Sequence, residues 1–421
     1  MIRRMLAIGF IFACTAIAWW VLAGITSSRT HQADQGLRSR VVQLWGAPQS
    51  QQPPALAVVR HETEQVETEV NGIKSRKAVV RRVAEPFALQ GSDVRAALSL
   101  EHRQKGLMWY ATYKVRFDAA YTLANPSHER QVVEIALPFP AERAVFDDLR
   151  FEVDGRPWLQ PPVAKAGRIT GRVELGPEEQ VTLRAGYRSQ GLDRWTYAFG
   201  SGVSDVRNFR LAVTTDFRDI DFPEDGISPT SKELSDRGWH LVWQFRRLVA
   251  GVNVAVVMPQ KLQPGPLAAE ISAFAPVSLF FFIVVLLAIG VVRGIDIHPM
   301  HFFFLAAAFF SFHLLFAYLA DQTGIHTAFG TAAATSLFLT VSYLRAAIGG
   351  RYAYLAAGAA QLLYLVLFSY AFFFRGLTGL AITLGAIVTL FVLMQLTARV
   401  DWRAVFSGHG SEKTGGRQLQ N

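Results

Sequence analysis

The sequence contains one cysteine, Cys14, and none of the short spacings by which histidine and cysteine bind metals. A single cysteine forms no intramolecular disulfide, so an exported part of this chain must be stabilised by its core alone. The histidines between 26 and 270 are isolated, with no H-x-H or H-E-x-x-H spacing. Gly200-Ser201-Gly202 lacks the pattern of a nucleophile elbow and is interpreted as a turn. The acidic run 216–225 lacks calcium-loop spacing and is interpreted as a solvated loop. Residues 26–270 therefore give no support for a metal, a cofactor or catalysis, and we expect a protein that is not an enzyme.

A basic stripe with interleaved aromatic residues, typical of nucleic-acid binding, is also lacking. The net charge is +9, but residues 26–270 hold 32 Lys and Arg against 29 Asp and Glu. The rest of the chain holds 10 basic residues against 4 acidic ones. The basic excess therefore flanks apolar segments, where it indicates membrane orientation and not a nucleic-acid partner.

Long apolar runs dominate the C-terminal part of the chain, and charged residues fall almost only between them. A membrane-spanning helix needs roughly 20 apolar residues, whereas buried helices of soluble proteins are shorter and amphipathic. The pattern therefore predicts a five-helix membrane domain at 271–398 in place of a large soluble helical core. The predicted spans are 271–292, 299–320, 327–344, 352–374 and 376–398.

A sixth apolar run, residues 5–25, follows a short basic N-terminus at 1–4. Such a run is compatible with a signal peptide cleaved after Ala23. It is longer than a usual signal core, however, and Trp19-Trp20 is typical of a membrane-interface belt. We therefore favour a retained first transmembrane anchor; with either alternative, the residues that follow are exported.

The orientation follows from the basic residues. With the N-terminus inside, nine of the ten basic residues that flank the spans lie on the cytoplasmic side, including those of the tail 399–421. We expect a multi-pass protein of the bacterial inner membrane with both termini in the cytoplasm. Residues 26–270 are then a periplasmic domain between the first and second spans.

That exported segment has the pattern of a β-rich domain. Asn71-Gly72 joins two alternating segments and predicts a two-residue hairpin with Glu69 opposite Lys74 and Val70 opposite Ile73. Short segments of period two separated by turn residues follow, and they predict an antiparallel β-sandwich-like fold. The predicted strands are 110–117, 132–137, 168–175, 180–187, 195–199, 209–215, 239–245 and 252–257. The predicted fold class is thus a six-helix membrane bundle with a large periplasmic antiparallel β-sandwich-like domain.

Polar residues inside the predicted spans are costly in a bilayer and form the candidate site. They are His298, His301, His313, Gln361 and Gln395. Hydrogen bonds between helices are the favoured interpretation, since such bonds are worth about 0.6–2 kcal/mol each. A functional polar site and a metal site are the alternatives.

Several motifs resemble the CreD-type inner-membrane cell-envelope-integrity family. The motifs are Leu44-Trp45-Gly46-Ala47-Pro48-Gln49, Phe222-Pro223 leading to Ser235–Trp239, His298-Pro299, Leu344 with Gly349-Gly350, and Thr397–Trp402. The sequence departs from the family pattern at two places. The Gly-Pro that the family has after the glutamine of the first motif appears here as Pro53-Pro54. The acidic pair that the family has between the last two helices is replaced here by Arg375-Gly376. A role of that acidic pair would not carry over to this chain. The resemblance implies an inner-membrane protein linked to envelope integrity and envelope stress, and it implies no catalytic residues.

These observations lead to a non-enzymatic membrane protein whose exported domain contacts an envelope protein or a cell-wall component. One alternative is a receptor that binds a ligand outside and signals through the helices to a separate cytoplasmic partner. Another is a small transporter or intramembrane enzyme built around His313, Gln361 and Gln395, which would have to face one cavity.

Overall fold

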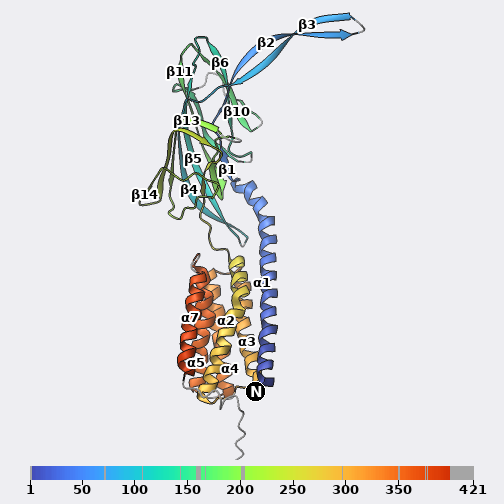
Figure 1. The fold of residues 1–421 in the computed structure, drawn as a ribbon, viewed down its shortest axis with the longest axis vertical. Helices are drawn as coiled ribbons and strands as arrows, with labels where there is room; N and C mark the ends of the chain where they lie inside the picture. The colour runs from blue at the N-terminus through green and yellow to red at the C-terminus, as the bar shows by residue number, and fades with distance from the viewer. Residues whose placement is uncertain are drawn as a thin grey trace, which may run out of the picture. The chain divides into compact units, whose positions relative to one another are not determined.

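The computed structural model describes residues 2–70, 73–106, 108–142, 144–157, 163–165, 167–200, 204–295, 297–348, 351–374, 376 and 378–398. The chain divides into two compact units. One comprises Met1–Gln35 together with the chain from Leu262 onward, and the other is Gly36–Lys261. The first is built from helices and the second mainly from strands (Figure 1).

Six helices among the described residues are long and apolar enough to cross a membrane, with mean hydropathy between 1.2 and 2.8. The helical elements are α1 (Ile2–Trp45), α2 (Pro264–Arg293), α3 (Pro299–Leu319), α4 (Ile325–Ile348), α5 (Arg351–Gln361), the π-helix η1 (Leu362–Leu367), α6 (Phe368–Tyr370), the 3₁₀ turn η2 (Ala371–Phe373) and α7 (Thr378–Thr397).

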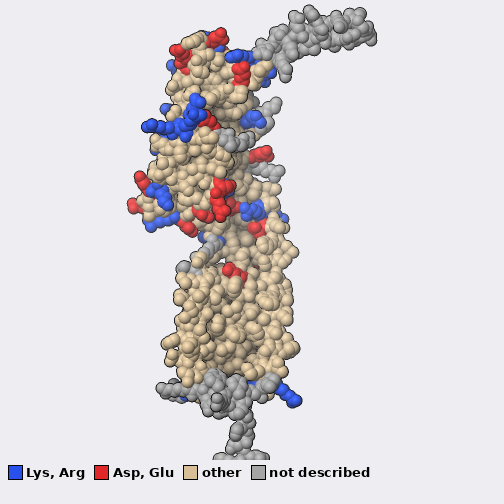
Figure 2. Space-filling model, viewed as in Figure 1, with Lys and Arg blue, Asp and Glu red and all other residues tan. Residues whose placement is uncertain are grey.

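The helical unit is apolar on its outside as well as in its core. On α7, Leu384, Ile387 and Phe391 expose 53%, 58% and 62% of their surface, whereas Phe309 and Phe312 of α3 are fully buried. On the face shown in Figure 2, the surface of this unit carries no charged side chain between its two ends. A helix that is apolar all round is typical of a core or of a membrane span.

The predicted spans agree with these helices except at three places. The first helix does not end at Ile25 but runs without a break to Trp45. The second predicted span begins seven residues late, because α2 starts at Pro264, where proline's missing N–H and fixed φ suit the first turn. The fifth predicted span is not one α-helix, since it changes to π-helix after Gln361 and ends in a 3₁₀ turn.

Sixteen strands are described in the other unit. They are β1 (Gln49–Gln51), β2 (Ala55–Val70), β3 (Ile73–Pro86), β4 (Gly91–Lys105), β5 (Met108–Ala124), β6 (Gln131–Pro138), β7 (Phe146–Val153), β8 (Arg156–Pro157), β9 (Val163–Lys165), β10 (Arg168–Leu175), β11 (Gln180–Leu192), β12 (Arg194–Tyr197), β13 (Ser204–Thr215), β14 (Ser231–Leu234), β15 (Trp239–Ala250) and β16 (Val254–Val257). They form sheets of three strands (β1-β12-β16), five strands (β3-β2-β6-β10-β9) and eight strands (β14-β15-β13-β4-β5-β11-β7-β8).

One apolar core draws side chains from all three sheets. Val58 of β2, Val94 of β4 and Trp195 of β12 belong to the same buried cluster. Sheets that share a core in this way agree with the predicted sandwich-like packing. The expectation of an antiparallel fold was wrong in one respect, because β1 pairs with β12, and β4 with β13, in parallel.

The predicted hairpin is confirmed in its register. β2 and β3 pair antiparallel, with Val70 opposite Ile73 and Glu69 opposite Lys74. The turn residues Asn71-Gly72 themselves lie outside the described residues.

The segment after α1 is held by Gly46 and two buried glutamines. Gly46 has φ +99°, and a Cβ there would lie 2.4 Å from the carbonyl oxygen of Gln190. Only glycine permits this approach without strain. Beyond it, Gln49 donates to Ser189 Oγ at 2.8 Å, and Gln51 Oε1 accepts from the Tyr187 hydroxyl at 2.7 Å. These bonds hold β1, a strand of the three-stranded sheet, against β11 of the eight-stranded sheet.

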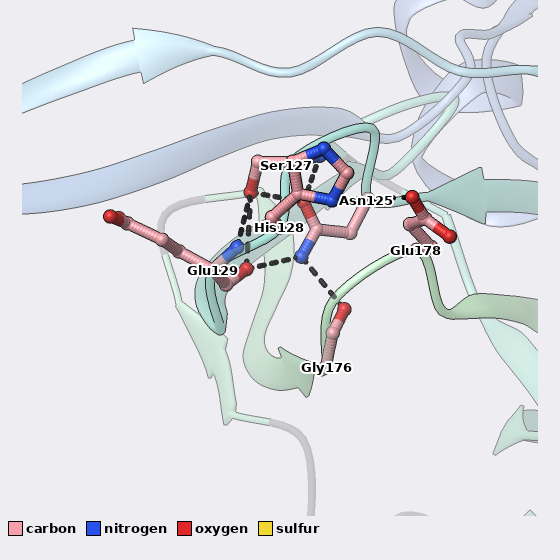
Figure 3. Close-up of polar contacts among 6 residues, drawn as sticks. All are labelled: Asn125, Ser127, His128, Glu129, Gly176 and Glu178. Carbon is pink, nitrogen blue, oxygen red and sulfur yellow. Dashed lines mark hydrogen bonds and ion pairs between the residues drawn. The ribbon is translucent and has the colours of Figure 1, made fainter.

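Asn125 joins two connections of the strand-rich unit (Figure 3). Its buried amide donates to the carbonyl oxygens of Glu129, at 2.7 Å, and Gly176, at 2.8 Å. Its Oδ1 accepts from the backbone N–H of Ser127 at 3.0 Å, which is an Asx turn. The exposed pair His128–Glu178 spans the same two connections at 3.2 Å. The cluster therefore fixes the β5–β6 loop against the β10–β11 turn.

Candidate functional site

Two of the five polar residues predicted as a site lie in the first turn of α3 or just before it. His298 is exposed and caps the helix, since its Nδ1 accepts from the backbone N–H of Met300 at 3.2 Å. This side chain satisfies an N–H that would otherwise lack a partner. His301 Nδ1 is hydrogen-bonded to the Tyr343 hydroxyl of α4 at 2.8 Å. His301 therefore makes the interhelical bond that the sequence predicts, and His298 does not.

His313 is buried in α3, with 1% of its surface exposed. Its Nδ1 donates to the carbonyl oxygen of Phe309, one turn earlier in the same helix, at 3.0 Å. Because a carbonyl only accepts, the neutral imidazole carries its proton on Nδ1, and Nε2 is left as an acceptor. Nε2 is buried and has no hydrogen-bond partner among the residues described. The ring instead packs edge-on against Trp19 of α1, with 5.2 Å between centroids.

Gln361 joins α5 to α4 and, through it, to α3. Its Nε2 donates to Ser336 Oγ at 2.8 Å, and Ser336 donates to the carbonyl oxygen of Ala308 at 2.6 Å. All of this lies in the core, since Gln361 and Ser336 expose none of their surface. Within the described part of the chain, Gln361 Oε1 and the hydroxyl of Thr340, one turn beyond Ser336, have no hydrogen-bond partner.

The π-helix η1, directly after Gln361, holds a second group of polar contacts. The Tyr364 hydroxyl donates to Thr389 Oγ1 of α7 at 2.8 Å, and the Ser278 hydroxyl of α2 donates to the Tyr364 carbonyl oxygen. π-Helical turns are rare and occur frequently at functional sites. Here the turn is the place where α2 and α7 bond to the fifth span.

Gln395 does not join these residues, because its side chain is exposed on α7. His313 and Gln361 also have separate partners. Within the described part of α2–α7, the buried polar residues comprise one histidine, one glutamine and hydroxyl residues, without a buried carboxylate, lysine or arginine. No group of three metal-ligating side chains occurs among the residues described. These residues form separate neutral hydrogen bonds, of which those of His301 and Gln361 join helices.

The sequence did not predict a second site, the open face of the eight-stranded sheet. Side chains alternate along its central strands between the core and the outside, as at Val94 (buried) and Arg95 (exposed) on β4. The outward side chains meet in cross-strand rows. One row reads Thr214–Ala97–Arg116–Arg188–Asp147, and its neighbour reads Ala212–Arg95–Asp118–Gly186–Arg150.

This face carries more cations than its acids neutralise. Arg150 pairs with Asp118 at 2.7 Å, and Arg210 with Asp93 at 3.3 Å. Arg116 and Arg184 form no ion pair among the described residues, although both side chains are exposed. The period-two charges of Lys114, Arg116 and Asp118 are visible in the sequence. The sequence does not show which strands bring these charges together, because that depends on the order of the strands in the sheet.

Glu101, at the end of this face, forms ion pairs with Arg103 and Lys114. A hydrogen bond from Arg103 and a weaker interaction with Lys114, 3.4 Å away, hold the pKa of the Glu101 carboxyl below its usual value.

Comparison with known proteins gives little further information. No protein-family model matches the chain, and no curated protein matches it. Among solved structures, a proposed nutrient binding protein from Legionella pneumophila aligns at a TM-score of 0.30 and 10% identity. The alignment covers 47% of this chain and 73% of that one. A TM-score this low does not indicate a shared fold or function.

Proposed function

We propose that this chain is a non-enzymatic protein of a bacterial inner membrane whose strand-rich unit binds an envelope component on its periplasmic side. Six helices would anchor it, and both termini would lie in the cytoplasm. The outer surface of α7, with Leu384 and Phe391 exposed, supports the membrane location, because such a surface is costly in water. The basic residues that flank the apolar runs support the orientation. The motifs similar to the CreD-type family are compatible with this function.

The open face of the eight-stranded sheet is the observation that carries the binding function. A sheet with one face in the core can simply expose the other to water. On this face, however, Arg116 lies directly opposite Arg188, and like charges in that position are unfavourable. Arg116 and Arg184 also form no ion pair among the described residues. Cations left in such a position suit an anionic partner.

A receptor is the second candidate, and α1 is the reason. This one helix contributes Trp19 to the core of the helical unit and Val41 to a buried cluster with Tyr110 in the strand-rich unit. A ligand that altered the packing of Val41 would act on the same helix that contacts His313. The receptor alternative therefore has a covalent route between a binding unit and the spans.

Filling the open face tests the proposed function. Ala97 is exposed on β4, so Ala97→Trp should fold and obstruct the middle of the face. Thr170→Trp, exposed on β10 of the five-stranded sheet, is the matched control. In a strain of the source bacterium that lacks the gene, we expect the control to restore resistance to envelope stress and Ala97→Trp to fail, at equal protein levels. Full restoration by both variants would show that this face is not the binding surface.

A further inference from the structure

A hollow of about 580 Å³ lies on the open face of the eight-stranded sheet. It is formed by β4, β5, β7, β11 and β13, and Ala97 and Thr214 line it as small side chains. Longer side chains surround these two positions, namely Lys114, Arg116, Arg188 and Arg237. Its volume lies within the range of about 300–1,000 Å³ that is usual for small-molecule sites.

The positive charge of this hollow exceeds what its acids neutralise. Asp216 accepts from the Ser99 hydroxyl and from the backbone N–H of Leu100 at 2.8 Å. Asp147 accepts from the backbone N–H of Asp148 at 2.9 Å. These hydrogen bonds leave both carboxylates charged, but two acids offset only two of the four basic side chains that line the hollow, so its net charge is positive.

The basic side chains of the hollow differ in whether they form ion pairs. Arg188 lies 3.1 Å from Asp148, and Lys114 lies 3.4 Å from Glu101, in pairs exposed to solvent and hence weak. Arg116 and Arg237 form no ion pair among the described residues. Arg116 is directly opposite Arg188 and two residues from Lys114 on the same face. An anion between these groups would relieve the repulsion.

Arg116 also lies at the centre of a longer groove. A second hollow, of about 350 Å³, shares Arg116, Ala97 and Thr214 with the first. It continues toward Arg95 and Arg210. The two hollows form one groove with Arg116 between them.

We infer that this groove binds a compact molecule with a phosphate group or paired carboxylates, and that Arg116 is its central anion-binding residue. The inference rests on the proposed function and names the ligand class of the same face. A guanidinium presents parallel N–H donors that match phosphate and carboxylate oxygens, and such charge-assisted bonds are among the strongest in proteins. The small side chains at positions 97 and 214 leave room for the group, and Arg188, Lys114 and Arg237 surround it.

Calorimetric titration of the full chain in an uncharged detergent tests this inference, with inorganic pyrophosphate and succinate as probes. We expect at least one probe to bind, and Arg116→Gln to weaken its binding about tenfold or more. Arg188→Gln should weaken it as well. Arg168→Gln is the control, since Arg168 is exposed on β10 of the five-stranded sheet and lines neither hollow. Binding of pyrophosphate alone identifies a phosphate site, and binding of succinate alone identifies a carboxylate site.

The inference is overturned if the wild-type chain binds neither probe at millimolar concentration, or if Arg168→Gln weakens binding as much as Arg116→Gln. These results are distinct from failure of the proposed function. If neither probe binds while Ala97→Trp still abolishes stress resistance, the face is used but its ligand class is wrong. If a probe binds at Arg116 while Ala97→Trp restores resistance, the anion site exists and the proposed function is wrong.

Discussion

Gln361 of α5 donates its side-chain amide to the Ser336 hydroxyl of α4 at 2.8 Å, and neither side chain is accessible to solvent. The Ser336 hydroxyl in turn donates to the Ala308 carbonyl oxygen of α3. Three helices are thus joined through one hydroxyl. Hydrogen bonds between spans are worth about 0.6–2 kcal/mol, so this one residue should contribute measurably to the stability of the bundle.

Ser336→Ala should therefore lower the free energy of unfolding by about 1–2 kcal/mol, because it leaves the buried Gln361 amide without its acceptor. Thermal unfolding in detergent measures the effect. Ser342→Ala is the matched control, since Ser342 is exposed on the same helix and bonds only to the Leu339 carbonyl oxygen. Equal melting temperatures for the two variants would contradict a structural role for the Ser336 bridge.

Substitution by phenylalanine should affect stability differently at His313 and at His301. His313→Phe keeps the ring contact with Trp19 and removes the unpartnered Nε2. It also removes the bond to the Phe309 carbonyl oxygen, but that oxygen still accepts a backbone N–H of the helix, so stability should change little. His301→Phe loses the bond to the Tyr343 hydroxyl and should be less stable by about 1 kcal/mol. If His313→Phe accumulates normally but fails in an envelope-stress assay, His313 is a functional site, and the transporter or enzyme alternative gains support.

The ion pair between Asp205 and Arg247 should contribute to stability in a way that depends on pH. Arg247 donates to both Asp205 oxygens at 3.0 Å, and this hydrogen bonding lowers the pKa of the Asp205 carboxyl. A lowered pKa in the folded state means that the contribution is present above the unfolded value near 3.8 and is lost as the pH falls through the folded value. Melting curves of wild type and Asp205→Asn should therefore begin to converge as the pH falls below about 3.8, and coincide below the folded-state pKa. They should also converge in 1 M salt, which screens exposed pairs. A difference that persists under both conditions would contradict the ion-pair origin.

Gly46→Ala should cost more stability than Gly155→Ala. Both glycines have positive φ, at +99° and +72°, but a Cβ at Gly155 meets nothing within 4 Å, whereas one at Gly46 meets the Gln190 carbonyl oxygen. Backbone strain alone costs roughly 1–3 kcal/mol, and the Gly46 variant should exceed the Gly155 variant by the cost of that clash. Chemical unfolding of both variants gives the difference. Equal losses would show that the backbone contact at Gly46 can relax.

Much of the fold was predictable from the sequence where the signal is local. The apolar runs end near charged residues, so four spans were placed within a few residues, and the Asn71-Gly72 pattern predicted the register of Val70 and Ile73. The π-helix after Gln361 was not predictable, because its leucines are compatible with an α-helix. The parallel pairing of β4 with β13 was not predictable either, since it joins residues more than a hundred positions apart, such as Ser92 and Phe209.

The candidate sites differ in the same way. His301 and Gln361 were found because a polar residue is conspicuous in an apolar run, but the exposure of Gln395 depends on how α7 packs. The groove was missed together with strand β4. Ala97 is apolar and yet faces outward, so the sequence Val94–Leu98 does not alternate clearly between apolar and polar residues. The same alanine helps to leave the hollow beside Arg116 open.

Labelling of single cysteines tests the membrane topology most directly. In a chain with Cys14→Ala, Val145→Cys would place the thiol at an 81% exposed position of the strand-rich unit, and Arg345→Cys at an exposed position near the end of α4. A membrane-impermeant maleimide is applied to cells whose outer membrane has been made permeable. We predict that Val145→Cys is labelled in these intact cells, and that Arg345→Cys is labelled only after the inner membrane is lysed. Labelling of Arg345→Cys but not Val145→Cys before lysis, or of both alike, would contradict a periplasmic strand-rich unit on a six-span anchor.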